Sequence, residues 1–360
     1  MLAFDSGADL LICNLEDESF LAAELRALFP QLPHRRVVPG LFATPDLCAV
    51  LPAAPPRLAF LRQWMPQARL TSSASIKAWA DVLSSTLVSE VPEDQPWRLH
   101  IEAWYGLANA GGNRCDLIRK TLAEVMKKRR RHLWRRLVDS TLPFQSDETL
   151  VQLLLISPDE GFVSVSKEPQ PKMNPQWLSP FPLGLIPVAV DKAAPSRAFA
   201  KVLEAQQRLG LEIQPGERCV DLGASPGSWS YVALRQGARV TAIDRSPLRE
   251  DLMTNPNLDF VQGDAFAYEP PRPVDWLLCD VIAAPDRSMD LALDWVRRGW
   301  ARRFVVTIKF KGREEYDRLQ RLKQEMSELC PHYRLTRLCA NKNEVCVFGS
   351  TETAPSLVHQ

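Results

Sequence analysis

Residues 220–229 read VDLGASPGSW, and this stretch decides the fold of the second half of the chain. An apolar strand pattern ends at Asp221, and glycines, small residues and a proline follow before an apolar pattern resumes at Trp229. A plain surface loop needs only one or two turn residues. In a nucleotide-binding βαβ unit, the glycines after the first strand let the backbone approach a ligand. The stretch therefore predicts the first turn of such a unit.

The sequence around this turn has the pattern of a mostly parallel sheet. Near-continuous apolar runs alternate with amphipathic helical stretches, as in sheets covered by helices on both faces. We expect helices over 289–300 and 314–329. The last two runs, YRLTRLCA and NEVCVFGS, are separated by a polar turn too short for a parallel crossover, so we expect an antiparallel C-terminal hairpin. The other runs are RCVDLG, ARVTAID, LDFVQGD, DWLLCDV and RFVVTIKF.

The first half of the chain is less regular and predicts an α+β region. Apolar runs at 41–52, 58–70, 97–106 and 150–166 are typical of strands. Helical patterns cover 18–28, 75–91 and 115–137. Frequent prolines from Ser166 to Ser196 exclude a continuous helix or a central strand there, and they indicate a linker or an extended arm.

The overall charge gives no general attraction to nucleic acid, because 44 lysines and arginines balance 43 acidic residues. The exception is KKRRRHLWRR at 127–136, inside the predicted helix 115–137. Most such runs are solvated helix faces. This one is almost purely cationic and includes His132 and Trp134, which suits phosphate neutralisation with some stacking. Contact with nucleic acid is slightly favoured over a solvated face.

Cysteine usage and the N-terminal residues indicate a cytosolic protein. The eight cysteines form no C-x-x-C pair and no cluster with histidine at metal spacing, so we expect buried, reduced thiols and no metal site. The first residues lack a basic region and a cleavage site, and no apolar run is long enough to cross a bilayer. We therefore expect a cytoplasmic chain that is neither exported nor bound to a membrane.

The spacing of the turn favours an adenosine cofactor that is not a dinucleotide. Gly223 and Gly227 give G-x-x-x-G, and Asp244 ends the next strand about 20 residues later, where an acid holds ribose hydroxyls. Small side chains from Ser225 to Ser228 leave room for the amino-acid tail of S-adenosylmethionine, with Asp221 near its ammonium group. Asp264, after the third strand, is placed to reach the adenine amino group. Together these positions favour a methyltransferase.

Longer segments carry a more specific resemblance. Seven segments carry it, namely SPF, APSRAFAK, VDLGASPGSW, LLCDV, VTIKFK, NEVCVF and, at 60–64, FLRQW. Together they resemble the RlmM family of ribose 2'-O-methyltransferases of large-subunit ribosomal RNA, within the FtsJ-like group. The resemblance implies S-adenosylmethionine as cofactor and a cytidine of 23S ribosomal RNA as target. The cofactor contacts that it implies are Ser196, Gly223, Ser225, Pro226, Gly227, Ser228, Asp244, Asp264 and Asp280.

The resemblance also implies a catalytic tetrad of Lys201, Asp280, Lys309 and Glu344. A ribose hydroxyl is a weak acid and a poor nucleophile, so its methylation needs a proton acceptor, a charge near the developing alkoxide and in-line alignment. Lys309 interrupts an apolar strand and is the candidate base or hydroxyl orienter, because cationic neighbours and partial burial lower the pKa of an amine. The two carboxylates would hold the two lysines.

The family has ferredoxin-like and THUMP regions for RNA at its N-terminus. We therefore expect a ferredoxin-like domain over 1–65, a THUMP-like RNA-binding domain over 66–170, a proline-rich linker over 171–195 and a Rossmann-like methyltransferase domain over 196–352. Three alternatives stay open: an RNA-binding protein with a silent methyltransferase domain, a 2'-O-methyltransferase of another RNA, and a small-molecule methyltransferase in which the tetrad is coincidental.

Overall fold

The computed structural model describes residues 7–52, 56–106, 110–142, 144, 147–167, 177–312 and 317–352. The chain divides into two compact units, Met1–Ile186 and Pro187–Gln360, and each has its own seven-stranded sheet. No helix in the described parts of the chain is long and apolar enough to cross a membrane.

The C-terminal unit has a mostly parallel sheet with the strand order β10-β9-β8-β11-β12-β14-β13. Neighbouring strands from β10 to β12 run parallel, whereas β14 runs antiparallel to both β12 and β13. The predicted parallel sheet with an antiparallel C-terminal hairpin is therefore confirmed. The strands are β8 (Arg218–Leu222), β9 (Arg239–Asp244), β10 (Leu258–Gln262), β11 (Val274–Cys279), β12 (Ala301–Lys309), β13 (Arg334–Thr336) and β14 (Glu344–Ser350).

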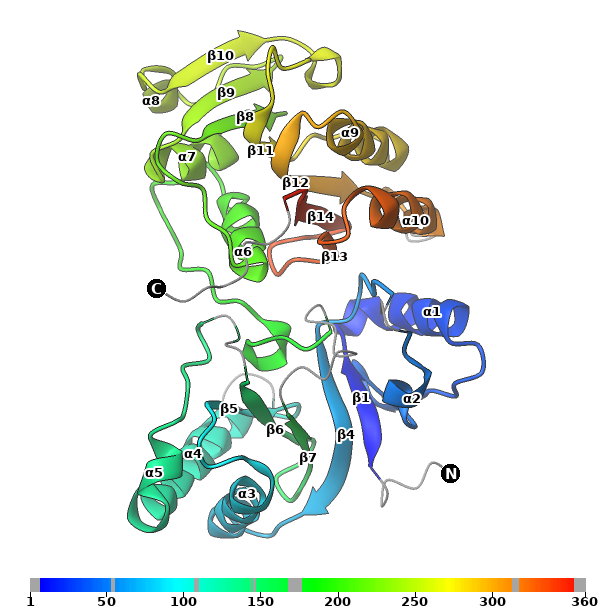
Figure 1. Cartoon of the computed structure of the whole chain (residues 1–360), viewed down its shortest axis with the longest axis vertical. Helices are drawn as coiled ribbons and strands as arrows, with labels where there is room; N and C mark the ends of the chain where they lie inside the picture. The colour runs from blue at the N-terminus through cyan, green and yellow to red at the C-terminus, as the bar shows by residue number, and fades with distance from the viewer. Residues whose placement is uncertain are drawn as a thin grey trace. The chain divides into compact units, whose positions relative to one another are not determined.

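Helices cover both faces of this sheet, as a parallel sheet requires. Figure 1 shows α6 and α7 on one face and α9 and α10 on the other. Val202 of α6 and Val232 of α7 share one buried cluster with Val240 of β9 and Leu278 of β11. The helices are α6 (Phe199–Leu209), α7 (Ser228–Arg235), α8 (Glu250–Met253), α9 (Pro285–Arg297) and α10 (Leu319–Leu329), with the short 3-10 helix η4 (Ala265–Ala267).

The N-terminal unit is α+β, as predicted, with the strand order β2-β3-β1-β4-β7-β6-β5. The long strand β4 pairs with β1 along its first half and with β7 along its second half, so one sheet runs through the whole unit. The strands are β1 (Ala8–Ile12), β2 (Arg35–Val38), β3 (Leu41–Thr44), β4 (Gln63–Ser72), β5 (Trp97–Ala103), β6 (Thr149–Leu155) and β7 (Glu160–Ser166). The helices are η2 (Leu15–Asp17), α1 (Glu18–Leu28), α2 (Leu47–Val50), α3 (Ile76–Glu90), α4 (Ala110–Arg129), α5 (Arg131–Trp134) and η3 (Pro182–Gly184).

The predicted four-part division stays a prediction, and two observations bear on its boundaries. The boundary between 65 and 66 falls inside β4. Within the predicted linker, residues 171–176 lie outside the described residues, whereas Trp177 and Ser179 are bonded to the N-terminal sheet. The carbonyl of Trp177 accepts a hydrogen bond from the Trp64 N–H at 2.9 Å, and the Ser179 N–H donates to Oε1 of Gln63 at 2.6 Å.

Several predicted elements differ in extent from the observed ones. The predicted strand 41–52 is β3 followed by the short helix α2, and strand 333–340 shrinks to β13. Helix 289–300 begins earlier, at Pro285, where proline suits the first helical position. Residues 314–316 of the predicted helix 314–329 lie outside the described residues, and α10 begins at Leu319. Six of the described cysteines are buried, but Cys339 is exposed, contrary to the expectation of buried thiols.

Candidate active site

The strand order of the C-terminal sheet reverses between β8 and β11, and we call the region at the carboxyl ends of these two strands the crevice. From β8 the chain builds outward through β9 and β10, then returns to add β11 and β12 on the other side of β8. Ligands of open α/β sheets bind at such a reversal point, outside the carboxyl ends of the strands. The predicted glycine turn follows β8 and Asp280 follows β11, so both lie at this point.

The four predicted tetrad residues lie together beside this crevice. Nζ of Lys201, on α6, is 3.1 Å from Oδ2 of Asp280 and 2.5 Å from Oε1 of Glu344. Lys309 ends β12, and its Nζ is 3.0 Å from Oδ1 of Asp280 and donates to the Asp280 carbonyl at 2.7 Å. Lys309 and Glu344 are also direct partners in the antiparallel ladder of β12 and β14. Two cations and two carboxylates thus form one connected group.

Access to solvent differs within this group. The side chain of Lys201 is 7% exposed, whereas that of Lys309 is 24% exposed. Burial alone would lower the pKa of Lys201, but Asp280 and Glu344 beside it raise that pKa above its ordinary value. Lys201 is therefore a fixed positive charge, and Lys309 is the amine of the group that an incoming molecule reaches more easily.

The glycine turn packs directly against the segment that follows Asp280. Gly223 has φ 73°, and a Cβ placed on it would lie 2.9 Å from Cα of Val281. Gly227 has φ 108°, and its Cβ would meet Cδ1 of Leu252 at 2.3 Å. Both positions therefore require glycine, for backbone conformation and for space. The close approach of Gly223 and Val281 joins the turn to the tetrad.

Asp244 and Asp264 end the crevice on the side of β9 and β10. Oδ2 of Asp244 accepts the Ser225 N–H at 3.0 Å, which ties this carboxylate to the glycine turn. Oδ1 of Asp264 accepts the Phe266 N–H at 3.0 Å, and its Oδ2 pairs with Arg245 at 3.0 Å. The Phe266 N–H, followed by Arg245, lowers the pKa of Asp264. Both carboxylates keep lone pairs for further donors.

Ser196 and Ser228 connect the start of α6 with the end of the glycine turn. Their hydroxyl oxygens are 2.7 Å apart, and Ser196 Oγ also accepts the Ala198 N–H. Nε1 of Trp229 donates to the Ala198 carbonyl at 2.9 Å. The Ser196–Ser228 contact links α6 to the glycine turn, and the Gly263 N–H donates to the Asp244 carbonyl at 3.0 Å. We call this row, from Ser196 through the glycine turn to Asp244 and Asp264, the cofactor edge.

Asp221 differs from its predicted position near a ligand ammonium group. It is 1% exposed, and its Oδ2 accepts both the backbone N–H and the hydroxyl of Ser230, at 2.8 and 2.7 Å. Burial raises the pKa of Asp221 to about 7. The residue anchors the first turn of α7 instead of facing the crevice.

Comparisons with known proteins agree with this geometry. Residues 194–340 match the FtsJ-like methyltransferase family. The ribosomal RNA large subunit methyltransferase M of Laribacter hongkongensis (strain HLHK9) is 35% identical over 216 residues, 57% of this chain and 59% of the relative. The protein of the same name from Xylella fastidiosa (strain 9a5c) is 34% identical over 181 residues, 48% of this chain and 52% of the relative. The resemblance to the RlmM family is confirmed. The chain matches between one half and two thirds of the length of these relatives.

The FtsJ-like match contains three of the four tetrad residues. Lys201, Asp280 and Lys309 lie within residues 194–340, and Glu344 lies four residues beyond the match. The contact between Glu344 and Lys201 is therefore an independent structural reason to include Glu344 in the site.

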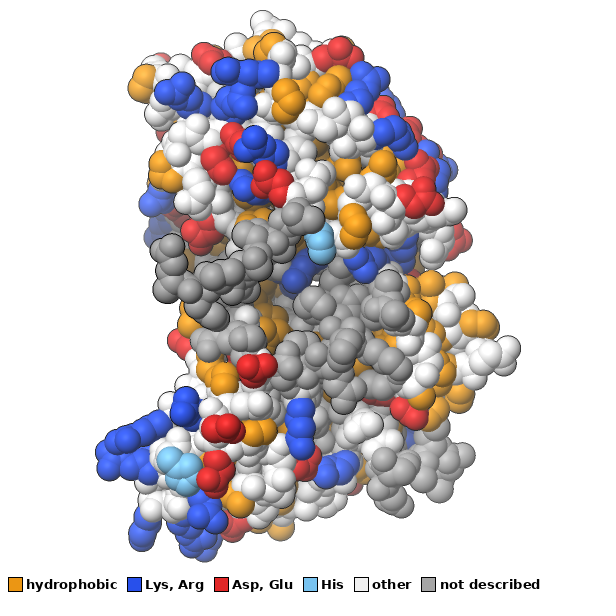
Figure 2. Space-filling model, viewed as in Figure 1, with side chains coloured by type: hydrophobic (Ala, Val, Ile, Leu, Met, Phe, Trp, Pro, Cys, Tyr) orange, Lys and Arg blue, Asp and Glu red, His pale blue; other side chains and the backbone are white. Residues whose placement is uncertain are grey.

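The basic stretch 127–136 lies in the N-terminal unit and is divided between two helices. Helix α4 ends at Arg129 and α5 begins at Arg131, so the predicted continuous helix 115–137 is wrong at Arg130, whose φ is −142°. The cations of the stretch are exposed, and Figure 2 shows lysine and arginine side chains gathered around a histidine at the lower left of the view. Trp134 is half-buried and packs edge-on against Trp97, with ring centroids 5.8 Å apart, so stacking on an RNA base is not favoured for it.

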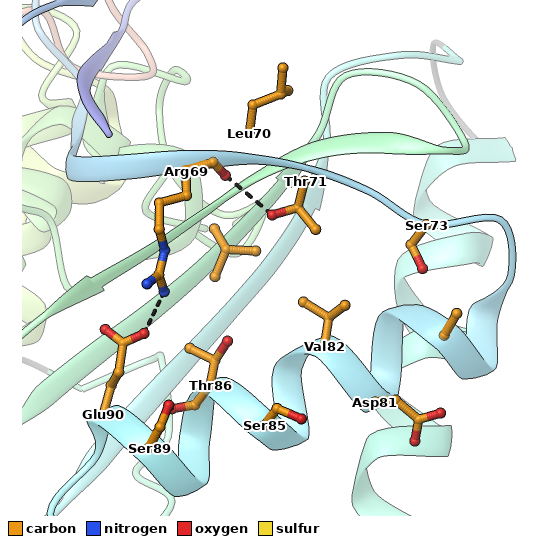
Figure 3. A pocket seen from close by; sticks show the side chains of 12 residues that line it. Arg69, Leu70, Thr71, Ser73, Asp81, Val82, Ser85, Thr86, Ser89 and Glu90 are labelled. Carbon is orange, nitrogen blue, oxygen red and sulfur yellow. Dashed lines mark hydrogen bonds and ion pairs between the residues drawn. The ribbon is translucent and has the colours of Figure 1, made fainter. Parts of the chain in front are cut away.

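A groove of about 790 Å³ lies between β4 and α3 of the N-terminal unit, and no sequence pattern indicated it. Figure 3 shows Arg69 of β4 paired with Glu90 of α3 at one end of this groove. Small hydroxyl side chains line much of the rest, namely Thr71, Ser73, Ser85, Thr86 and Ser89. The paired charges leave little net charge for recognition of an anion.

Proposed function

We propose that this protein transfers a methyl group from S-adenosylmethionine to the 2'-hydroxyl of a ribose in large-subunit ribosomal RNA, with a cytidine of 23S RNA as the target nucleotide. The observation that carries this proposal is the connected group of Lys201, Asp280, Lys309 and Glu344 beside the glycine turn. The relatives named as large subunit methyltransferases support the choice of RNA. Activity on ribosomal RNA implies a cytoplasmic protein.

The residues along the crevice suit S-adenosylmethionine, which supplies an activated methyl group when bound. Asp244 would accept the ribose hydroxyls of the cofactor, and Asp264 would accept the adenine amino group. The backbone and small side chains from Gly223 to Ser228, with Ser196 beside them, would hold the amino-acid tail. Asp280 lies where the cofactor edge and the tetrad meet.

The tetrad would prepare the hydroxyl for methylation. Lys309, the more exposed lysine, would orient the 2'-hydroxyl and, as a neutral amine that has first released a proton to solvent, receive the hydroxyl proton. Asp280 contacts both lysines and would fix their separation. Lys201 would remain charged and stabilise the developing negative charge on the oxygen, because a preorganised cation acts strongly in a partly buried site. Glu344 would hold Lys201 through its own ion pair with the same amine.

The N-terminal unit would bind the RNA. We assign this role to the THUMP-like region, 66–170, which includes the exposed cations of 127–136, since phosphate contacts supply much of the affinity for nucleic acids. The ferredoxin-like region, 1–65, would assist the THUMP-like region in binding the RNA.

The test is methyl transfer from tritiated S-adenosylmethionine to ribosomal RNA from cells that lack this protein, with the modified position mapped by resistance to alkaline cleavage. We expect one 2'-O-methylated nucleotide in large-subunit RNA. RNA binding without transfer would instead support the silent-domain alternative. Transfer to another RNA would support a 2'-O-methyltransferase of that RNA. Transfer to small molecules alone would support a small-molecule methyltransferase.

A further inference from the structure

An exposed isoleucine lies at the edge of the candidate active site. Ile282 is 89% exposed, and it belongs to the segment 280–284, which connects β11 to α9. Single exposed apolar residues are common and need no special account. The position of this one is unusual, because it follows the tetrad residue Asp280 by only two residues.

The backbone on both sides of Ile282 leads to packed residues. Val281 packs so closely against the glycine turn that a Cβ on Gly223 would lie 2.9 Å from its Cα. On the other side, the buried Pro285 begins α9. Two residues of chain span at most about 7 Å, so Ile282 stays close to Asp280. Its side chain therefore projects into solvent from a segment that contacts the glycine turn at Val281 and begins with the tetrad residue Asp280.

The proposed substrate brings an apolar surface to this place. A ribose whose 2'-hydroxyl reaches Lys309 carries its base on the adjacent ring carbon, so the base lies within a few ångströms of the reacting oxygen. Enzymes that act on an unstacked nucleotide hold its base against aromatic or apolar side chains, because an unstacked base has lost its stacking partners. The apolar side chain of Ile282 offers such a contact beside a group of charged residues.

We propose that Ile282 packs against the base of the nucleotide to be methylated and so sets the affinity of the site for its target. The proposal rests on the proposed RNA methyltransferase function. Ile282 would contact the substrate in addition to the tetrad. It would take no part in binding the cofactor, which we assign to the residues from Ser196 to Asp264.

The experiment combines a protein change with an RNA change. Ile282→Ser removes the apolar contact, and Val190→Ser is the matched control, because Val190 is 88% exposed in the same unit. Large-subunit RNA is prepared by splinted ligation with either the normal target nucleotide or an abasic ribose at that position. Single-turnover methyl transfer is measured as a function of RNA concentration, and cofactor affinity is measured separately by calorimetry.

On normal RNA, we expect Ile282→Ser to raise the half-saturating RNA concentration about tenfold, as expected for the loss of an aliphatic side chain that becomes largely buried on binding. Ile282→Val should recover most of the affinity, and Val190→Ser should behave like the unmodified protein. On abasic RNA, the difference between Ile282→Ser and the unmodified protein should vanish. Cofactor affinity and melting temperature should not change, since the side chain is exposed.

Three results would overturn the proposal. If the unmodified protein methylates RNA and Ile282→Ser is equally effective, Ile282 makes no contact with the substrate. If the penalty persists on abasic RNA, or if cofactor affinity falls, Ile282 acts elsewhere than on the base. If the unmodified protein transfers no methyl group to RNA, the proposed function fails and the contact fails with it.

Discussion

Nζ of Lys201 lies 2.5 Å from Oε1 of Glu344, although the two residues are 143 positions apart and come from α6 and β14. Both side chains are almost fully buried, at 7% and 10% exposure. Asp280 and Glu344 raise the pKa of Lys201 against the effect of burial, so this amine stays protonated at neutral pH. Glu344 thus holds the charge of Lys201 in place and has a positioning role in our proposed mechanism.

Glu344→Gln should therefore slow methyl transfer without abolishing it. The amide still accepts a hydrogen bond from Lys201, but the fixed charge that orients the lysine is removed. We expect a single-turnover rate roughly 10- to 100-fold lower, the effect of a misplacement of about 1 Å in a preorganised site. Cofactor affinity, measured by calorimetry, should be unchanged. A rate as low as that of Lys309→Ala would contradict a purely positioning role.

Asp244 provides a test of the cofactor edge. Asp244→Ala leaves the ribose hydroxyls of S-adenosylmethionine without their acceptor, and we expect binding to weaken by about 1–3 kcal/mol. The matched control is Asp259→Ala, an exposed aspartate on the neighbouring strand β10. Calorimetry on the full chain gives both values. Equal affinities for the two variants would remove Asp244 from the cofactor site.

Local patterns predicted some of these elements well. The helix expected over 18–28 matches α1, because its apolar residues recur at helical spacing and bury Leu21 and Leu25. The C-terminal sheet was also predicted, since its central strands, such as β11 and β12, are largely apolar and buried. The tetrad residues were identified by resemblance, and their distances follow from the strand order that brings β11, β12 and β14 together.

Elements that depend on distant contacts were missed. Strand β1 contains Asp9, which suggests a surface loop, yet Asp9 is fully buried because Trp64 and the backbone of Leu47 and Gln67 donate to it. Asp221 was misplaced for a similar reason, since its partner Ser230 was not part of the pattern. The exposure of Ile282 could not be predicted from the sequence, because its apolar neighbours are typical of a buried segment.

The basic stretch gives a prediction on RNA affinity. Charge reversal at Arg129, Arg130 and Arg131 should weaken RNA binding, and removal of each phosphate contact should flatten the slope of log affinity against log salt by about 0.7–0.9. The control reverses three scattered exposed cations, Arg26, Lys77 and Lys120, and so changes the net charge equally. Filter binding at several salt concentrations distinguishes them. Identical slopes for the two triple variants would show that the stretch is a solvated face.

Asp221 predicts an unusual dependence of stability on pH. Its pKa is raised from 3.8 to about 7 in the folded protein, mainly by burial, so the folded state binds more protons than the unfolded state between these values. Stability from this group is present below pH 4 and is lost as pH rises toward 7. Asp221→Asn stays neutral and keeps an acceptor for the Ser230 N–H. The variant should therefore gain about 2–3 kcal/mol relative to the unmodified protein between pH 5 and pH 8.

Urea unfolding at these two pH values measures that gain. Asp259→Asn removes an exposed carboxylate from the same sheet and should alter stability equally at both. A constant difference between Asp221→Asn and the unmodified protein would mean that Asp221 is ionised at pH 5, and that the burial of its carboxylate is offset by the bonds to Ser230.

Lys309 is the residue on which the proposed chemistry depends most. It is the more exposed lysine of the tetrad, and its Nζ is held by Oδ1 and the carbonyl of Asp280. Lys309→Ala should reduce the rate of methyl transfer to RNA about 100- to 10,000-fold, the range for removal of a positioned acid–base group. Cofactor affinity should stay within about twofold, because this role is realised in the transition state. Lys309→Arg should also fail, because a guanidinium does not give up its proton.

The assay is single-turnover transfer of tritiated methyl groups to large-subunit RNA that lacks the modification, so that product release does not mask the chemical step. Lys311→Ala is a control at a lysine two positions further along the chain, outside the tetrad, and it should transfer at a rate close to that of the unmodified protein once RNA is saturating. A slow Lys309→Arg rate that rises with pH, beside an inactive Lys309→Ala, would assign Lys309 to orientation alone. Near-normal transfer by Lys309→Ala would refute the tetrad mechanism, and with it the main structural reason for proposing a ribose 2'-O-methyltransferase.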